Sequence, residues 1–235
     1  MSDRFRVATY NIRKCVGLDR QRKPGRVLDI VSDLEADIVA LQEADRRLGP
    51  RPSALPRRMI DIHSDMEPVT LAANDVSLGW HGNALLVRKG TRVRHAERLN
   101  LPHLEPRGAV LAELEIRGRA LRVIGAHLAL VRRFRQAQAA TLADTLGARP
   151  AMPTVILGDF NEWSVLGALA PLAAGYDWHA PGRSFHAAQP MAALDRIATG
   201  PEITLWDAGV EEGAAARQAS DHLPVWADLR WHGAD

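Results

Sequence analysis

The sequence predicts an α/β fold in which helices cover the faces of β-sheet. Segments rich in β-forming residues alternate with segments whose apolar residues recur at helical spacing, and the order strand, helix, strand occurs twice along the chain. The 235 residues contain no low-complexity tract and no linker, so we expect one domain that spans residues 1–235.

The composition narrows the class of protein. With 46% hydrophobic and 25% charged residues, the chain has enough apolar material for a core and does not resemble a disordered protein. Cys15 is the only cysteine, which excludes an intrachain disulfide and a thiolate zinc site. No apolar run approaches the ~20 residues that cross a bilayer, and residues 1–10 are too charged for a signal peptide. We therefore expect a cytoplasmic protein with no transmembrane segment and no obligate protein partner.

The first strand–helix–strand unit lies near the N-terminus. Residues 5–12 are rich in β-forming side chains and predict a strand. A helix is expected after Pro24, because apolar residues between 27 and 34 recur at i, i+3, i+4 and i+7. The short apolar run at residues 38–41 predicts a second strand, and Glu43 follows its end.

The second unit repeats this plan without repeating the sequence. Residues 122–126 predict a strand that ends at His127, and residues 132–146 predict a helix. The apolar run at residues 154–157 predicts a buried strand, after which the chain reaches Asp159. In both units, polar groups stand where strands end.

The rest of the chain predicts additional strands and two long loops. Additional strands are expected at residues 83–87, 109–116, 203–210 and 225–231. The strand at 109–116 is expected to pair, through a tight turn at Arg117 and Gly118, with residues 120–125 of the strand that ends at His127. Residues 44–80 and 160–193 are expected to be surface loops. The first contains five arginines between Arg46 and Arg58, in a segment interrupted by three prolines.

Five polar groups of residues lie at the edges of predicted strands. They contain Asn11, Glu43, Asp159 with Asn161, Asp195, and Asp221 with His222. A single such group is explained by a turn in which Asp or Asn bonds to nearby backbone. Five groups with the same placement are better explained by a shared site.

The residue types in these groups restrict the chemistry. Carboxylate and amide oxygens suit Mg²⁺ or Mn²⁺, whereas zinc favours clustered histidine and cysteine. Histidines beside carboxylates act as general acids or bases, or stabilise a phosphoryl transition state, and such a group contributes roughly 10² to 10⁴-fold. The chain has no Gly-x-Ser-x-Gly nucleophile motif and no phosphate-binding loop that ends in Gly-Lys-Ser/Thr. Attack of water on a phosphate ester fits this set.

The ordered motifs resemble the endonuclease/exonuclease/phosphatase superfamily. They are Thr9-Tyr10-Asn11-Ile12, Leu41-Gln42-Glu43, Gly82-Asn83-Ala84, His127-Leu128, Gly158-Asp159-Phe160-Asn161, Leu194-Asp195-Arg196-Ile197 and Ser220-Asp221-His222. Residues 13–19 are similar to an uncharacterised bacterial branch. The resemblance implies a four-layered α-β-β-α sandwich, with two mainly antiparallel or mixed sheets face to face, helices outside and an active site at one edge.

The resemblance also implies a metal site. Glu43 is expected to be the principal ligand of Mg²⁺, with Mn²⁺ as the other candidate ion. Asn11 and Asp221 are expected to bind the metal directly or through water.

The same resemblance assigns the catalytic residues. Asp159 is expected to orient or deprotonate the attacking water, and Asn161 to hold that water or the phosphate. His222, paired with Asp195, is expected to polarise the phosphate or assist proton transfer. His127 is expected to contact the same phosphate from the other half of the chain.

Three further residues are expected to bind substrate. Asn83 belongs to one of the motifs above, and Arg107 is either a phosphate contact or an exposed arginine in a turn. Arg135 lies in a basic stretch at the start of the predicted helix. This stretch either binds along a phosphate backbone, contacts a lipid headgroup, or forms a solvated face of the helix.

These residues predict a divalent-metal-dependent hydrolase that cleaves phosphodiester or phosphomonoester bonds with activated water. Its expected substrate is a phospholipid headgroup or another small phosphoester, and a DNA or RNA nuclease of the same superfamily is the alternative. The net charge of +2 argues against nucleic-acid binding through bulk charge alone. A non-catalytic binding or scaffold module is a third class, but such a module is expected to lack a metal or acid–base residue.

Overall fold

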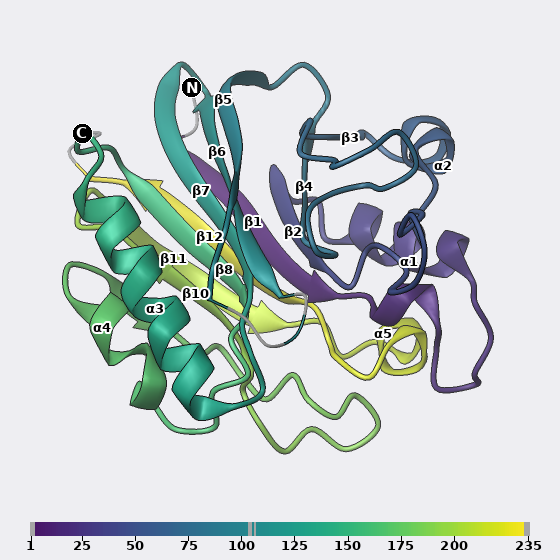
Figure 1. The fold of residues 1–235 in the computed structure, drawn as a ribbon. Helices are drawn as coiled ribbons and strands as arrows, with labels where there is room; N and C mark the ends of the chain where they lie inside the picture. Colours follow the sequence, from purple (N-terminus) through teal and green to yellow (C-terminus); the bar gives the residue numbers. More distant parts are fainter. Residues whose placement is uncertain (1–2, 103–104, 106, 233–235) are drawn as a thin grey trace.

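Two six-stranded β-sheets pack face to face in the computed structural model, which describes residues 3–102, 105 and 107–232 (Figure 1). The first sheet has the order β11-β12-β1-β2-β4-β3 and the second has the order β5-β6-β7-β8-β10-β9. Helices lie outside both sheets, which confirms the expected four-layered α/β sandwich.

The element bounds are as follows. The first sheet contains β1 (Arg4–Asn11), β2 (Ile38–Gln42), β3 (Met66–Pro68), β4 (Ala84–Arg88), β11 (Ile203–Val210) and β12 (Val225–Trp231). The second contains β5 (Arg92–Leu99), β6 (Gly108–Ile116), β7 (Arg119–His127), β8 (Thr154–Asp159), β9 (Asp177–His179) and β10 (Asp195–Thr199). The helices are α1 (Pro24–Asp33), α2 (Arg57–His63), α3 (Arg132–Gly147), α4 (Ala170–Ala173) and α5 (Ala214–Ala219), with short 3-10 turns η1 (Arg13–Cys15) and η2 (Gly167–Leu169).

Three apolar clusters hold the four layers together. Successive side chains of a strand point to opposite faces, so each central strand serves two clusters. In β1, Val7 packs between the sheets while Ala8 packs toward α1. In β7, Val123 packs between the sheets while Ile124 packs toward α3. Strands buried on both faces explain why the predicted central strands are nearly continuous apolar runs.

Each sheet is built around one strand–helix–strand unit, as the sequence predicts. β1 and β2 are parallel neighbours connected through α1, with Thr9 opposite Ala40. β7 and β8 are parallel neighbours connected through α3, with Ile124 opposite Ile156. Parallel strands end at the same edge of a sheet, so each unit delivers the residues at its two strand ends to one edge.

The expectation of two plain surface loops is wrong. The first loop contains α2 and β3, and the second contains η2, α4 and β9. Arg57 and Arg58 belong to α2, which starts directly after Pro56, so the three prolines mark only the segment that precedes a helix. β5 also escaped prediction, because it is a largely exposed edge strand without alternation of apolar and polar residues.

Candidate active site

Polar side chains from both sheets meet at one edge of the sandwich. In the first sheet, Asn11 ends β1 and Glu43 directly follows β2. In the second sheet, His127 ends β7 and Asp159 ends β8. The side-chain amide of Asn11 donates a hydrogen bond of 3.0 Å to Asp159 Oδ2, which joins the two sheets at this edge.

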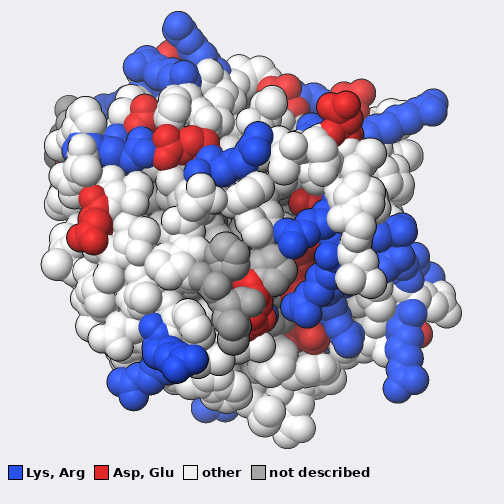
Figure 2. All heavy atoms as spheres, in the orientation of Figure 1, with Lys and Arg blue, Asp and Glu red and all other residues white. Residues whose placement is uncertain are grey.

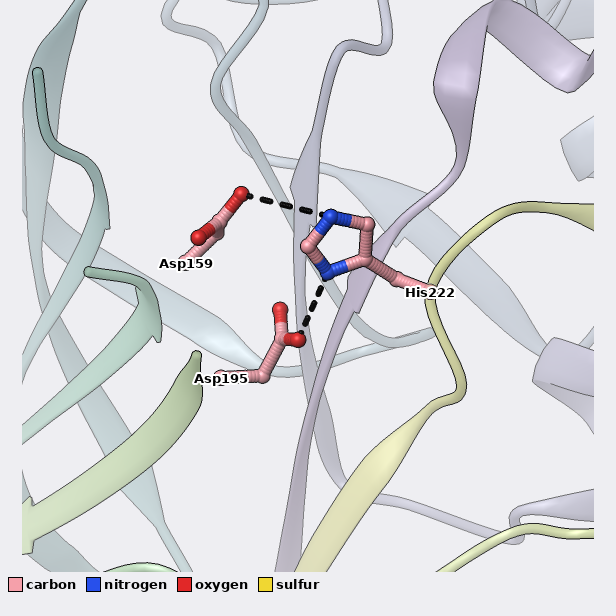
Figure 3. A group of neighbouring side chains, drawn as sticks. All are labelled: Asp159, Asp195 and His222. Carbon is pink, nitrogen blue, oxygen red and sulfur yellow. Dashed lines mark hydrogen bonds and ion pairs between the residues drawn. The ribbon is translucent and has the colours of Figure 1, made fainter. Parts of the chain in front are cut away.

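Asp159, His222 and Asp195 form a buried row of charged groups (Figure 3). His222 Nδ1 lies 2.7 Å from Asp195 Oδ2, and His222 Nε2 lies 3.7 Å from Asp159 Oδ2. The hydroxyl of Ser184 donates to the same Asp195 oxygen at 2.5 Å. None of the three row members is more than 5% exposed, so the imidazole is held between two carboxylates away from solvent.

The two carboxylates favour the charged form of His222. Burial alone would lower the pKa of this imidazole, but Asp195 and Asp159 raise it to about 10. Burial also opposes ionisation of Asp159, yet His222 and His127 hold the pKa of this carboxyl well below its usual range. At neutral pH, His222 is therefore an imidazolium that donates hydrogen bonds, and Asp159 is a carboxylate.

A second imidazole, that of His127, approaches the same carboxylate and is itself in contact with Arg107. His127 Nε2 lies 3.2 Å from Asp159 Oδ2 and contacts the guanidinium of Arg107. Arg107 also donates to the carbonyl of Leu128 at 3.0 Å and pairs with Glu105 at 3.1 Å. Arg107 is 7% exposed, so it is not an exposed arginine of a turn. Its contact with His127 places it beside the predicted catalytic residues.

Two buried asparagines hold the backbone at this edge. The backbone N–H of Asn161 donates to Asp159 Oδ1 at 3.1 Å, and its side-chain amide donates to the carbonyl of Leu128 at 3.0 Å. Asn83 donates to the carbonyl of Gly108 at 3.1 Å, while its Oδ1 has no hydrogen-bond partner among the described residues. Asn161 therefore fixes the orientation of the Asp159 carboxylate, and Asn83 contributes a buried acceptor.

The backbone at the site is locally strained. Glu43 and Asn161 adopt left-handed conformations, with φ of 53° and 51°. Such conformations cost roughly 1 to 3 kcal/mol and concentrate at functional sites. A Cβ atom on Gly158 would lie 1.9 Å from the carbonyl oxygen of Ala126, so glycine is required where β8 approaches β7 just before Asp159.

The predicted metal ligands face basic side chains from the segment that follows β1. We refer to Glu43, Asn11 and Asp221 as the oxygen set. Glu43 forms an ion pair with Lys14, and Asp221 Oδ2 lies 3.3 Å from Arg13 Nε. Asn11 Oδ1 accepts a hydrogen bond of 3.1 Å from the backbone of Arg13. The carboxylates of this set therefore already attract positive charge.

The oxygen set offers the donor types that a hard divalent cation prefers. Its donors are all oxygens, as Mg²⁺ prefers. The side chains of Lys14 and Arg13 are 24% and 39% exposed and are long, so they can leave the carboxylates to a metal ion. The ligand atoms of Asp159, Asp195 and His222 lie within 4.8 Å of one another, but a histidine must be neutral to bind a metal.

Arg135 does not join the other predicted residues. It is 5% exposed, and its Nε pairs with Glu162 at 3.1 Å. Its Nη1 donates to the carbonyls of Ala129 at 2.8 Å and Leu130 at 2.9 Å. The guanidinium thus supports two loops from inside the molecule, in contrast to the substrate contact or solvated helix face that the basic stretch suggests.

Sequence reasoning missed two side chains at the site. Lys14 follows Asn11 by only three positions, so a basic residue next to a predicted metal ligand was an available signal. Ser184 has no local signal, because it meets Asp195 only when the segment before β10 folds back as a hairpin, with Ser184 and Phe185 bonded to Ala192.

Basic side chains border the site. A pocket that contains Glu43 and His127 is also lined by six basic residues, which we call the basic wall: Lys14, Arg46, Arg47, Arg51, His81 and Arg107. Figure 2 shows basic side chains gathered along one side of a depression in which acidic side chains are visible. The other acid of this pocket is Asp45. Its carboxylate accepts hydrogen bonds from the backbone N–H groups of Leu78 at 2.6 Å and Gly79 at 3.2 Å. The pocket therefore favours anionic groups.

Comparison with known proteins identifies the family. The model of the Endonuclease/Exonuclease/phosphatase family matches residues 8–222. The chain belongs to this family. Its members are phosphoesterases or nucleases that generally depend on a divalent metal, and the match confirms the predicted resemblance. No helix among the described residues is both long and apolar enough to span a membrane.

Individual relatives agree with this assignment. Uncharacterized protein YbhP of Escherichia coli strain K12 is 29% identical over 253 residues, which cover 96% of each chain. Two solved structures are similar in fold. Bacteroides thetaiotaomicron mannosyl-6-phosphatase Bt3783 has a TM-score of 0.77 at 16% identity, with 97% of this chain and 100% of that chain covered. TDP2 of D. rerio, complexed with a single strand DNA product, has a TM-score of 0.76 at 16% identity with the same coverage.

Proposed function

We propose that the protein hydrolyses phosphodiester or phosphomonoester bonds by attack of an activated water, with Mg²⁺ or Mn²⁺ held by the oxygen set. One observation carries this proposal. The buried Asp159 carboxylate lies 3.2 Å from His127 and 3.7 Å from His222, and Asn11 of the other sheet donates to it. Family membership supports the same class of reaction.

The oxygen set supplies the metal site in this proposal. A bound divalent ion would neutralise charge on phosphoryl oxygens and lower the pKa of a bound water. Burial opposes ionisation of Glu43, but nearby His127 and Lys14 hold its pKa below the usual value, so Glu43 is a carboxylate at neutral pH. Asn11 contributes a carbonyl oxygen, and Asp221 contributes a second carboxylate.

The residues of the second sheet and His222 act on water and phosphate. Because the pKa of Asp159 is far below its usual range, this carboxylate is a weak base and serves mainly to orient the water. The His222 imidazolium donates a hydrogen bond to a phosphoryl oxygen or protonates the leaving group, while Asp195 holds it in place. His127 and Asn161 contact the phosphate or the water.

The reaction does not require a covalent nucleophile from Cys15. The thiol is buried, and burial raises its pKa to about 12, so the thiolate is scarce at neutral pH.

We also propose a cytoplasmic location, which the single cysteine suggests. Fractionation of the native host, with a cytoplasmic marker as control, tests it.

The proposed substrate is a small phosphoester or a phospholipid headgroup, and the basic wall supports an anionic molecule of this kind. Hydrolysis of nucleic acid is the second candidate, because a structural neighbour is a complex with a single strand DNA product. A non-catalytic module is disfavoured, because every predicted metal and acid–base residue is present in the chain.

A metal-supplemented activity screen tests the proposal. Purified protein with Mg²⁺ or Mn²⁺ is offered an aryl phosphodiester, phospholipids, inositol phosphates, single-stranded DNA and abasic duplex. We expect turnover of at least one class, and a loss of roughly 10² to 10⁴-fold in Asp159→Asn. Asp61→Asn, whose exposed carboxylate lies on α2, is the matched control and is expected to retain activity. Full turnover in Asp159→Asn would contradict the proposal.

A further inference from the structure

Exposed apolar side chains are concentrated on the segments next to the site. Among the described residues, six of the ten large hydrophobic side chains that are exposed lie on four segments at the ends of β2, β7, β8 and β10. We call these six the apolar rim, and they are Leu48, Leu130, Val131, Trp163, Val165 and Met191. Leu48 and Val165 are 86% exposed, and Trp163 is 67% exposed. These segments adjoin strand ends at the edge of the sandwich that holds the site, and exposed apolar side chains in such a place favour contact with another molecule.

Two buried arginines support the backbone of the segments that follow β7 and β8. Arg135 binds the carbonyls of Ala129 and Leu130, and it pairs with Glu162 of the next segment. Arg196 of β10 binds the carbonyls of Glu162 and Ser164 at 2.6 Å each and also contacts the carbonyl of Val165. The backbone polar groups thus face the interior, so the exposed side chains belong to supported loops.

The exposed charge on the four segments that carry the rim has one sign. The four rim segments are residues 44–51, 128–134, 160–166 and 186–193. They carry the exposed arginines Arg46, Arg47, Arg132 and Arg133. Their acids, Asp45 and Glu162, are each 5% exposed and are bound by backbone N–H groups or by Arg135. The outward surface therefore combines apolar tips with positive charge.

This combination favours an anionic lipid surface over nucleic acid. Apolar side chains gain free energy on entry into the acyl boundary, and arginines pair with anionic headgroups. A nucleic acid would use the arginines and could stack a base on Trp163, but Leu48, Leu130 and Val165 offer no aromatic face.

We propose that the apolar rim docks the protein on anionic lipid bilayers and presents the site to a phosphoester at that surface. The docking is independent of catalysis, whereas the placement of the substrate rests on the proposed function. The occupant is the bilayer itself, with the apolar tips at the acyl boundary and the arginines at the headgroups.

Vesicle co-sedimentation of the full chain tests the docking. The probe is a set of vesicles of phosphatidylcholine with about one third phosphatidylglycerol, compared with pure phosphatidylcholine, and the protein is the Asp159→Asn variant, so that hydrolysis does not alter the lipid. We expect binding to the anionic vesicles and at least tenfold weaker binding after Trp163→Ser with Val165→Ser. The matched control is Trp206→Ser with Val93→Ser, the same two residue types at exposed positions on β11 and β5, 54% and 39% exposed, which is expected to bind as the parent does.

Three outcomes would overturn the inference: no binding to anionic vesicles by a folded parent, equal losses in the rim and control variants, or displacement from vesicles by a single-stranded oligonucleotide that binds through the rim. Circular dichroism verifies that each variant is folded. In otherwise wild-type protein, the rim substitutions are expected to lower turnover of a vesicle-borne phosphoester and to leave turnover of a soluble aryl phosphodiester unchanged. Vesicle binding without turnover of any ester would refute the proposed function alone.

Discussion

The two strand–helix–strand units have the same architecture but offer different environments to their polar residues. The unit β1-α1-β2 places Glu43 at a position where its side chain is 17% exposed and faces Lys14. The unit β7-α3-β8 places Asp159 where its side chain is 2% exposed and lies between two imidazoles. One carboxylate is accessible to a cation from solvent, and the other is enclosed by groups that exchange protons.

The difference between these environments lies in the partners of each carboxylate. In the first unit, Glu43 faces the partly exposed side chain of Lys14. In the second unit, Asp159 faces the buried imidazoles of His127 and His222. The bond from Asn11 to Asp159 couples the two environments, so a metal at one would act on water oriented by the other.

Replacement of His222 by Gln is expected to have the largest effect on the second environment. The imidazolium is lost while the volume is nearly kept, so kcat should fall by roughly 10² to 10⁴-fold. In the wild type, the pKa of about 10 means that the imidazolium form persists at neutral pH and is lost as pH rises through that value. Asp195→Asn should shift this alkaline limb of the pH–rate profile to lower pH, because it removes the charge that raises the pKa most. An unchanged profile would contradict the role of the pair.

The buried ion pair of Arg135 and Glu162 connects the loops that follow β7 and β8. A substitution in this pair tests how much it stabilises the fold. Although burial opposes ionisation of Glu162, hydrogen bonds from Ser164, Ala168 and Arg135 lower its pKa from 4.5 to about 2. This pKa shift corresponds to a contribution of about 3 kcal/mol to the free energy of unfolding at neutral pH.

Glu162→Gln is therefore expected to reduce the free energy of unfolding by about 3 kcal/mol at pH 7, measured by urea denaturation. A lowered pKa stabilises the fold above the unfolded value, so the wild type should lose this advantage as pH falls from about 4.5 to about 2. A difference between wild type and variant that stays constant over this range would show that the ionised carboxylate is not the cause.

A comparison of metal ligands tests the first environment and has the smallest expected effect. Glu43→Gln should weaken Mg²⁺ binding by at least about tenfold in isothermal titration calorimetry, since it removes a charged donor of the oxygen set. Asp195→Asn should change this affinity by less than about threefold, because Asp195 belongs to the buried row. The reverse result would place the metal between Asp159, Asp195 and His222.

The local sequence pattern was sufficient to predict the central strands and the helices packed on them. Strand β8 and helix α3 follow from a short apolar run and from helical spacing, because both are buried against neighbouring layers. Strand β5 and helix α2 did not follow, because an exposed edge strand and a short helix after Pro56 carry little periodic signal.

The residues of the site were predictable to a similar extent. The sequence singled out Glu43, Asp159 and His222 because polar residues at strand ends are visible in one dimension. It misjudged Arg135, because the i to i+27 pairing with Glu162 exists only in the folded chain. The left-handed backbone of Glu43 is likewise set by the surrounding structure and not by residue type, whereas asparagine at position 161 is a residue type that tolerates this conformation.

The sequence by itself determined two strand–helix–strand units and the chemical types of the groups at their ends. Tertiary structure decided which groups meet, because Asn11 and Asp159 are 148 positions apart and touch only when the two sheets pack. It also decided the state of each group, since burial and neighbouring charge set whether a carboxylate faces a basic side chain at the surface or an imidazolium in the interior.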